Sequence, residues 1–113
     1  MRTMQVGCIR VVVELLEDKR LVAGDDRDNS AILGESDSNR HTVRLYNSPV
    51  PGELGVTFYH ELMHQIVDAY RVRTLREKDG THNEDSIDAL AIGLQEALSS
   101  LGVDITKYIK EPV

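Results

Sequence analysis

The hydrophobic pattern changes its period halfway along the chain, and this change constrains the fold more than any other feature. Before the segment "NSPVPGE" (47–53), apolar residues form short runs rich in Val and Ile or alternate with polar residues, which is typical of strands. From Leu54 to Val72 they recur every three or four residues, which is helical spacing. Pro49 and Pro51 cannot donate ladder hydrogen bonds, so we expect the sheet to end there. The sequence therefore predicts an α+β fold in which the sheet precedes the helices.

The element boundaries follow from the same patterns. We expect about three short strands, over residues 6–15, 31–37 and 41–46, with a charged loop over 17–30. Since the connections are short, an antiparallel meander is predicted. Two helices should follow, over 54–72 and 83–100, and Gly102 is well placed to end the second. The whole chain, 1–113, is expected to form one domain.

Composition and charge exclude several classes of protein. Of the 113 residues, 41% are hydrophobic and 28% charged, which is globular rather than disordered composition. The net charge of −6 argues against a general nucleic-acid binder, because phosphate contacts need Lys and Arg. No apolar run approaches the length of a membrane span. Cys8 is the single cysteine, so no internal disulfide can form, which fits the cytoplasm. We therefore expect neither nucleic acid nor membrane as a partner, and the oligomeric state stays open.

The segment "YHELMHQIVD" (59–68) carries the main chemical signal. His60 and His64 are four residues apart, so a helix presents both imidazoles on one side. Imidazole nitrogens are preferred zinc ligands. Glu61 is offset by about 100° on the helix, so it is placed to reach a water on the metal rather than the metal itself. The spacing predicts His60 and His64 as zinc ligands and Glu61 as the general base, against the alternative of two incidental histidines.

A catalytic zinc site needs a third protein ligand and one open position. The pattern H-E-x-x-H-x-x-G-x-x-H is excluded, because Val67 and Tyr70 stand where it requires Gly and His. The remaining candidates lie in "THNEDSIDAL" (81–90), where Glu84 is best placed and Asp85 and His82 are alternatives.

The acidic start of this second helix also has a purely structural explanation. Thr81 and Glu84 fit the S/T-x-x-E capping box, and acidic residues in a first turn are favoured by the helix dipole. Asp88 lies one helical turn beyond Glu84 on the same face. Both acids could therefore serve the helix alone, without any metal.

Two motifs taken together resemble a known family. The pairing of "HELMH" (60–64) with "NEDSID" (83–88) is similar to the H-E-x-x-H and N-E-x-x-x-D motifs of the gluzincins, the thermolysin-like zinc metallopeptidases. The resemblance implies that Glu84 is the third zinc ligand. It also implies that Asp88 supports His60 through a hydrogen bond.

A weaker resemblance extends over nearly the whole chain. The order of an initial strand, "LGESD" (33–37), "TVRLY" (42–46) and "HELMHQ" is similar to small phage- and mobile-element-encoded H-E-x-x-H metallopeptidase-like proteins. The chain departs from them at Gln65, where a small residue usually follows the second histidine. The resemblance implies a minimal zincin-like domain that hydrolyses a peptide or protein substrate in the cytoplasm, which would be the host cytoplasm for a phage-encoded protein.

Three functions remain open from the sequence. The preferred one is peptide-bond hydrolysis by a zinc-activated water with Glu61 as general base, the oxyanion donor being Tyr59, Tyr70 or His82. The first alternative is a non-catalytic zinc-containing binding or regulatory module, against which the presence of Glu61 argues. The second is a structural or host-interaction protein of a virion without bound metal.

Overall fold

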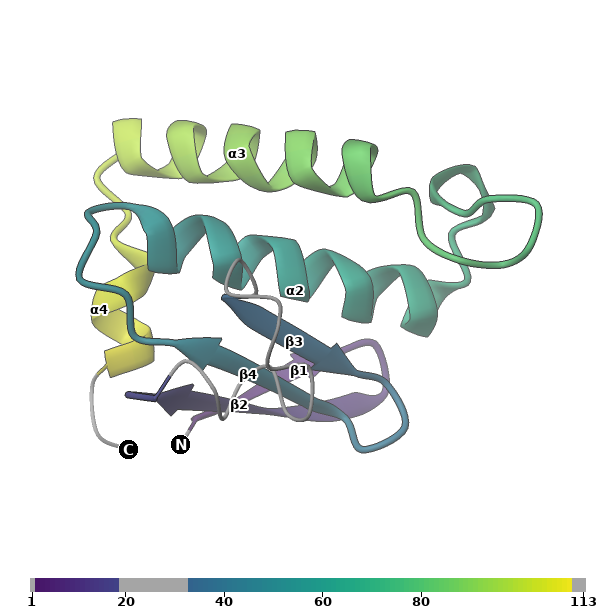
Figure 1. Ribbon diagram of the computed structural model, residues 1–113, viewed down its shortest axis with the longest axis horizontal. Coiled ribbons are helices and arrows are strands. Elements are labelled where there is room, and N and C mark those ends of the chain that lie inside the picture. Colours follow the sequence, from purple (N-terminus) through teal and green to yellow (C-terminus); the bar gives the residue numbers. More distant parts are fainter. Residues whose placement is uncertain (1, 19–32, 111–113) are drawn as a thin grey trace.

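Helix α2 lies between a four-stranded sheet and helix α3 (Figure 1). The computed structural model describes residues 2–18 and 33–110. In chain order the elements are β1 (Arg2–Val6), β2 (Ile9–Leu16), β3 (Gly34–Asp37), β4 (Thr42–Tyr46), α2 (Glu53–Tyr70), the 3-10 turn η1 (Arg73–Leu75), α3 (Glu84–Ser100) and α4 (Ile105–Lys110). The predicted α+β class is confirmed. Within the described ranges, no helix is long and apolar enough to cross a membrane.

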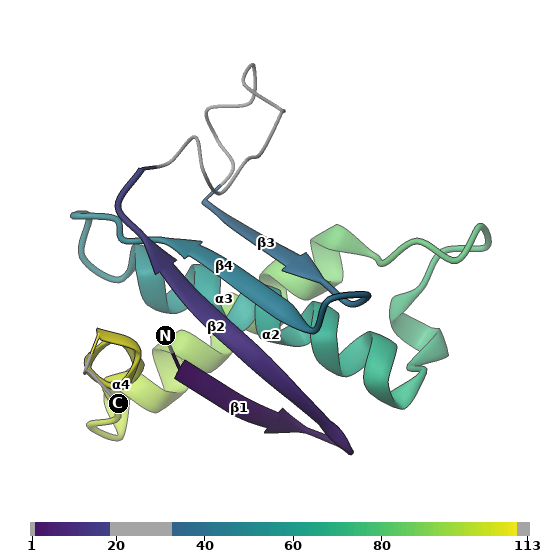
Figure 2. The same ribbon diagram turned by 90° about the horizontal axis from the view of Figure 1, so that it is seen from below.

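The strand order in the sheet is β1-β2-β4-β3, which Figure 2 shows from the side opposite the helices. The β1–β2 and β3–β4 pairs are antiparallel, but β2 and β4 run parallel, with Val13 opposite Val43 and Leu15 opposite Leu45. The predicted meander is therefore wrong at this central pair. The two most apolar strands lie together in the middle, and the short polar strand β3 lies at the edge.

The predicted first strand, 6–15, corresponds to β2, and β1 precedes it across a tight turn as a strand that was not predicted. Gly7 has φ +60° and, with Cys8, connects β1 to β2 in a hairpin. Glycine adopts this left-handed conformation without a steric penalty, so a two-residue turn fits there. The predicted second strand is shorter than expected, β3 beginning at Gly34, and Ala31 and Ile32 lie outside the described residues, as does most of the predicted loop over 17–30.

The core lies between the inner face of the sheet and α2. The residues that fill it are aliphatic or aromatic and almost fully buried: Val6, Val11, Val13, Val43, Leu45, Leu54, Phe58, Tyr59, Ala91 and Ile109. Ile87 of α3 is also fully buried. Helix α3 ends as predicted, with Gly102 at φ +83° and its N–H donating to the Ser99 carbonyl at 3.0 Å. Helix α4, which the sequence analysis did not predict, adds Ile109 to the core.

Truncation of Leu45 tests this core. Leu45 in β4 has 0% exposure, so Leu45→Ala should lower the free energy of unfolding by about 2–5 kcal/mol through lost contacts and a residual cavity. Leu90→Ala is the matched control, because Leu90 of α3 is 44% exposed and should cost about 0.5 kcal/mol or less. Chemical denaturation measures both variants. Equal losses for the two would contradict the described core.

Candidate metal centre

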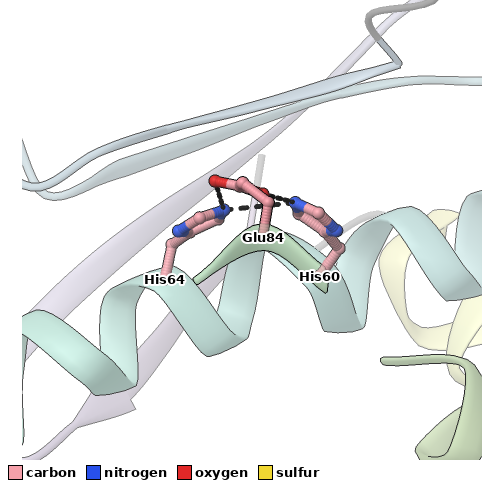
Figure 3. A group of neighbouring side chains, drawn as sticks. All are labelled: His60, His64 and Glu84. Atoms are coloured by element: carbon pink, nitrogen blue, oxygen red, sulfur yellow. Dashed lines mark hydrogen bonds and ion pairs between the residues drawn. The ribbon is translucent and has the colours of Figure 1, made fainter. Parts of the chain in front are cut away.

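Helices α2 and α3 bring the three predicted ligands together. His60 and His64 project from the middle of α2, and Glu84 reaches them from the first turn of α3 (Figure 3). His60 Nε2 and His64 Nε2 are 3.1 Å apart. Glu84 Oε2 is 3.1 Å from His60 Nε2, and Glu84 Oε1 is 3.2 Å from His64 Nε2. Two imidazoles and one carboxylate therefore converge on one point.

The spacing of these donor atoms fits a tetrahedral metal ion. Ligand bonds of roughly 2.0–2.1 Å in a tetrahedron place neighbouring ligand atoms about 3.3 Å apart. The separations of 3.1, 3.1 and 3.2 Å lie close to this value, the two to Glu84 being measured to its two different carboxylate oxygens. In the part of the chain that the structure describes, these three residues form the one group of His, Cys, Asp or Glu side chains with such spacing. Three protein ligands leave a fourth position open, as in catalytic zinc sites.

The outer nitrogens of both imidazoles are engaged by other side chains. His60 Nδ1 is 2.6 Å from Asp88 Oδ1, the contact that the sequence resemblance predicts. His64 Nδ1 is 2.6 Å from His82 Nδ1, and His82 Nε2 is 2.8 Å from Asp68 Oδ1. The sequence analysis did not find the roles of His82 and Asp68. The position of Asp68, four residues after His64 on the same helix, was the available signal.

Glu61 lies buried next to the three ligands. It is 6% exposed, and its Oε1 is 3.9 Å from His60 Nε2. Burial, together with the negative charges of Glu84, Glu35 and Asp88, raises the pKa of Glu61 to about 8. Burial also lowers the pKa of His64, although Glu84 opposes this, and so favours the neutral imidazole that can bind a metal.

Strand β3 lies directly over Glu61. A Cβ on Gly34 would meet Thr57 Cγ2 at 2.6 Å and Glu61 Cγ at 3.0 Å, so only glycine allows this close approach. The buried Gln65 donates a hydrogen bond to Ser36 Oγ at 2.7 Å and ties α2 to the same strand. Gln65, where the chain departs from the resemblance, thus has a structural role beside the site.

The structure does not contain the capping box between Thr81 and Glu84 that the sequence allowed. The N-cap of α3 is Asn83, whose side chain accepts a hydrogen bond from the Ser86 N–H at 2.9 Å. Thr81 instead donates its hydroxyl to Asp79 at 2.6 Å. Because the cap is made without it, the Glu84 carboxylate is available to the histidines.

The other sequence candidates occupy different positions. Tyr59 is buried in the core, where it packs edge-on against Phe58 with ring centroids 5.4 Å apart. Tyr70 is 62% exposed, and its ring lies against Gly7 in the β1–β2 turn. His82 lines the site, but both its ring nitrogens contact His64 and Asp68. Neither tyrosine is therefore placed as an oxyanion donor.

Two hollows flank the ligands. One, of about 370 Å³, lies between residues 34–36 of β3, the three ligands and His82. The other, of about 310 Å³, lies beyond His60 and is lined by Leu33, Val56, Thr57 and Asp88. The candidate metal centre therefore stands at the floor of an open depression beside the edge strand, accessible to a ligand of some size.

The fold and the site define an α+β domain with a three-residue candidate metal centre between helices α2 and α3. Comparison with known protein families, curated proteins and solved structures gave no match. The functional argument therefore rests on the geometry and chemistry of this chain, and the gluzincin resemblance stays a prediction from its two motifs.

The raised pKa of Glu61 predicts how the stability of the metal-free protein depends on pH. Between its ordinary pKa of 4.5 and about 8, the unfolded chain has released the Glu61 proton while the folded chain retains it. The free energy of unfolding should therefore fall as pH rises through this window. Glu61→Gln should reduce the fall, while Glu96→Gln, at an exposed position of α3, should leave it unchanged. Denaturation with a chelator present measures it; parallel curves for the parent and Glu61→Gln would refute the raised pKa.

Proposed function

We propose that the chain is a zinc-dependent metallopeptidase of gluzincin type, with His60, His64 and Glu84 as metal ligands and Glu61 as general base. The convergence of two imidazole nitrogens and the two Glu84 carboxylate oxygens, at separations of 3.1–3.2 Å, is the observation that carries the proposal. Glu61 of the His-Glu-x-x-His motif points toward these ligand atoms, with its Oε1 3.9 Å from His60 Nε2. The order and spacing of the two sequence motifs support the same assignment.

Zinc is proposed because of the donor set. Two imidazole nitrogens with one carboxylate oxygen match the ligand type and number of catalytic zinc, whereas calcium and magnesium prefer oxygen ligands alone. Imidazole also accepts other first-row metals, so metal availability contributes to the choice. Cys8 lies exposed in the β1–β2 turn and is not part of the group.

The residues around the ligands suit hydrolysis. A zinc ion bound here supplies Lewis-acid chemistry and increases the acidity of water. Glu61 is the acceptor of the proton that the attacking water releases, and it can return that proton to the leaving amine. Without metal its pKa is about 8, and a nearby cation lowers that pKa and so favours the ionised carboxylate that a base requires. Buried surroundings keep the carboxylate in one position.

The edge strand supports a peptide as substrate. Strand β3 pairs with β4 on one side only, and residues 34–36 line the hollow beside the ligands. An extended peptide can add to such an edge through main-chain hydrogen bonds. This mode would carry the peptide backbone past Glu61, which lies beneath Gly34. The expected substrate is therefore an extended segment of peptide or protein.

A non-catalytic zinc module is the second candidate. The positions of Tyr59 and Tyr70, away from the ligands, favour it, because neither can stabilise an oxyanion. The buried Glu61 favours hydrolysis, since a structural zinc site needs no base. Both candidate functions predict bound zinc, but only the metallopeptidase predicts that a substrate is hydrolysed.

Metal affinity tests the ligand assignment. The parent should bind one equivalent of zinc, and His60→Ala or His64→Ala should abolish binding. Glu84→Ala should weaken it by more than about 100-fold, because a ligand is lost, and Asp88→Ala by about 10–100-fold, the usual effect of losing a ligand's hydrogen-bond partner. Asp85→Ala, in the same exposed helical turn as Glu84, is the control for helix charge. Titration against a competing chelator measures these affinities; equal values for all the acid variants and the parent would return Glu84 to a role in the helix alone.

Turnover tests the role of Glu61. Glu61→Gln should keep the fold and the zinc, but lose about 10²–10⁴-fold in hydrolysis of an unstructured polypeptide, because the amide cannot accept a proton. Glu96→Gln is the control for removal of a carboxylate. Activity of Glu61→Gln within a few-fold of the parent would show that Glu61 is not the base. A zinc-loaded parent without any activity would favour the non-catalytic module.

A further inference from the structure

We propose that His82 and Asp68 form a relay that holds His64 in the tautomer required for metal binding. The inference concerns positioning residues and rests on the proposed metal site. Two contacts link the relay in series, one between Asp68 and His82 and one between His82 and His64. None of these contacts belongs to the two sequence motifs that suggested the site.

Asp68 is the fixed end of the relay. Burial raises the pKa of Asp68, but hydrogen bonds from Ser38 and His82 and the charge of Arg76 lower it by more. The pKa therefore lies below its ordinary value, and the carboxylate is ionised. Arg76 Nη2 donates to Asp68 Oδ1 at 2.7 Å, and the Ser38 hydroxyl donates to Oδ2. An ionised carboxylate only accepts hydrogen bonds, so His82 Nε2 must donate to it.

The proton position on His82 then determines which nitrogen of His64 carries the proton. A neutral imidazole carries one N–H, so His82, which donates from Nε2, presents a lone pair at Nδ1. His64 Nδ1 lies 2.6 Å from His82 Nδ1 and must be the donor to its lone pair. The two Nδ1 atoms are 2.6 Å apart and the ring centroids only 4.8 Å, so the Nδ1 atoms lie almost on the line between the centroids and the rings, whose planes differ by 19°, meet edge to edge. His64 Nε2 is left with its lone pair toward His60 and Glu84.

The turn that carries His82 is held in place by backbone and side-chain contacts. Residues 76 and 82 form an isolated antiparallel bridge, and the Asn83 N–H donates to the Leu75 carbonyl at 2.7 Å. Arg76 joins this turn to the relay, since Nη1 donates to the Gly80 carbonyl at 2.9 Å while Nη2 contacts Asp68. The position of His82 is therefore set independently of the metal ligands.

The two imidazoles are thus supported in different ways. His60 donates directly to a carboxylate, Asp88, at 2.6 Å. His64 instead donates to the Nδ1 lone pair of a second imidazole, His82, which is itself anchored to the Asp68 carboxylate. In both rings the outer nitrogen is the donor and Nε2 faces the site. Such outer partners fix the tautomer and ring orientation of metal-binding histidines.

Two substitutions at His82 separate positioning from packing. In His82→Asn the amide Oδ1 takes the place of Nδ1 and can accept the His64 proton, so zinc affinity should stay within a few-fold of the parent. In His82→Phe the ring shape is kept but the acceptor is lost, so affinity should fall by about 10–100-fold. A packing role predicts the opposite order, because phenylalanine preserves the ring. His41→Phe, at an exposed histidine, and Asp79→Asn, in the same turn, are the controls and should bind as the parent does.

The experiment combines chelator competition with ring-nitrogen NMR of the metal-free protein at alkaline pH, where imidazoles are neutral. The relay predicts a His64 proton on Nδ1 in the parent and a loss of that preference in His82→Phe. A proton on Nε2 of His64 in the parent would overturn the inference, as would zinc affinity of His82→Phe equal to or above that of His82→Asn. If the parent binds no zinc, the proposed function fails and the NMR measurement alone decides the relay.

Discussion

The packing of α3 against the middle of α2 is the interaction on which the candidate site depends. Ile87 and Ala91 of α3 are fully buried, and they lie three and seven residues after Glu84, on the same side of the helix. Their burial sets the height and rotation of the first turn of α3. Glu84 and Asp88 then meet His60 from that turn. A metal site of this kind depends on the hydrophobic packing of α3 against α2, because neither helix alone supplies all three ligands.

The charges around this contact favour a cation. Glu61, Glu84 and Asp88 gather around the two imidazoles, and burial together with the neighbouring negative charges raises the pKa of Glu61 to about 8. Both imidazoles present Nε2 to the same point as the Glu84 oxygens. A divalent ion at that point would satisfy the lone pairs and relieve the repulsion together. The charges and the donor geometry therefore each favour, independently, a divalent cation at this point.

The sequence predicted what depends on local periodicity. Helical spacing located α2 and α3, Gly102 marked the end of α3, and the four-residue spacing of His60 and His64 placed both on one side. It failed where distant segments decide the outcome, as in the parallel pairing of β2 with β4, and it also missed strand β1 with its Gly7 turn and helix α4. The relay from Asp68 was missed for the same reason, because only the folded turn brings His82 beside His64. Gly34 likewise has meaning only once β3 lies over Glu61.

The central claim is that one metal ion is held by two imidazoles of α2 and one carboxylate of α3. X-ray absorption spectroscopy of the protein loaded with one equivalent of zinc tests it most directly. We expect a first shell of nitrogen and oxygen at roughly 2.0–2.1 Å with the multiple scattering of two imidazoles, and no zinc bound at this site in His64→Ala. A sulfur shell at about 2.3 Å from Cys8, or a spectrum with no imidazole scattering, would contradict it.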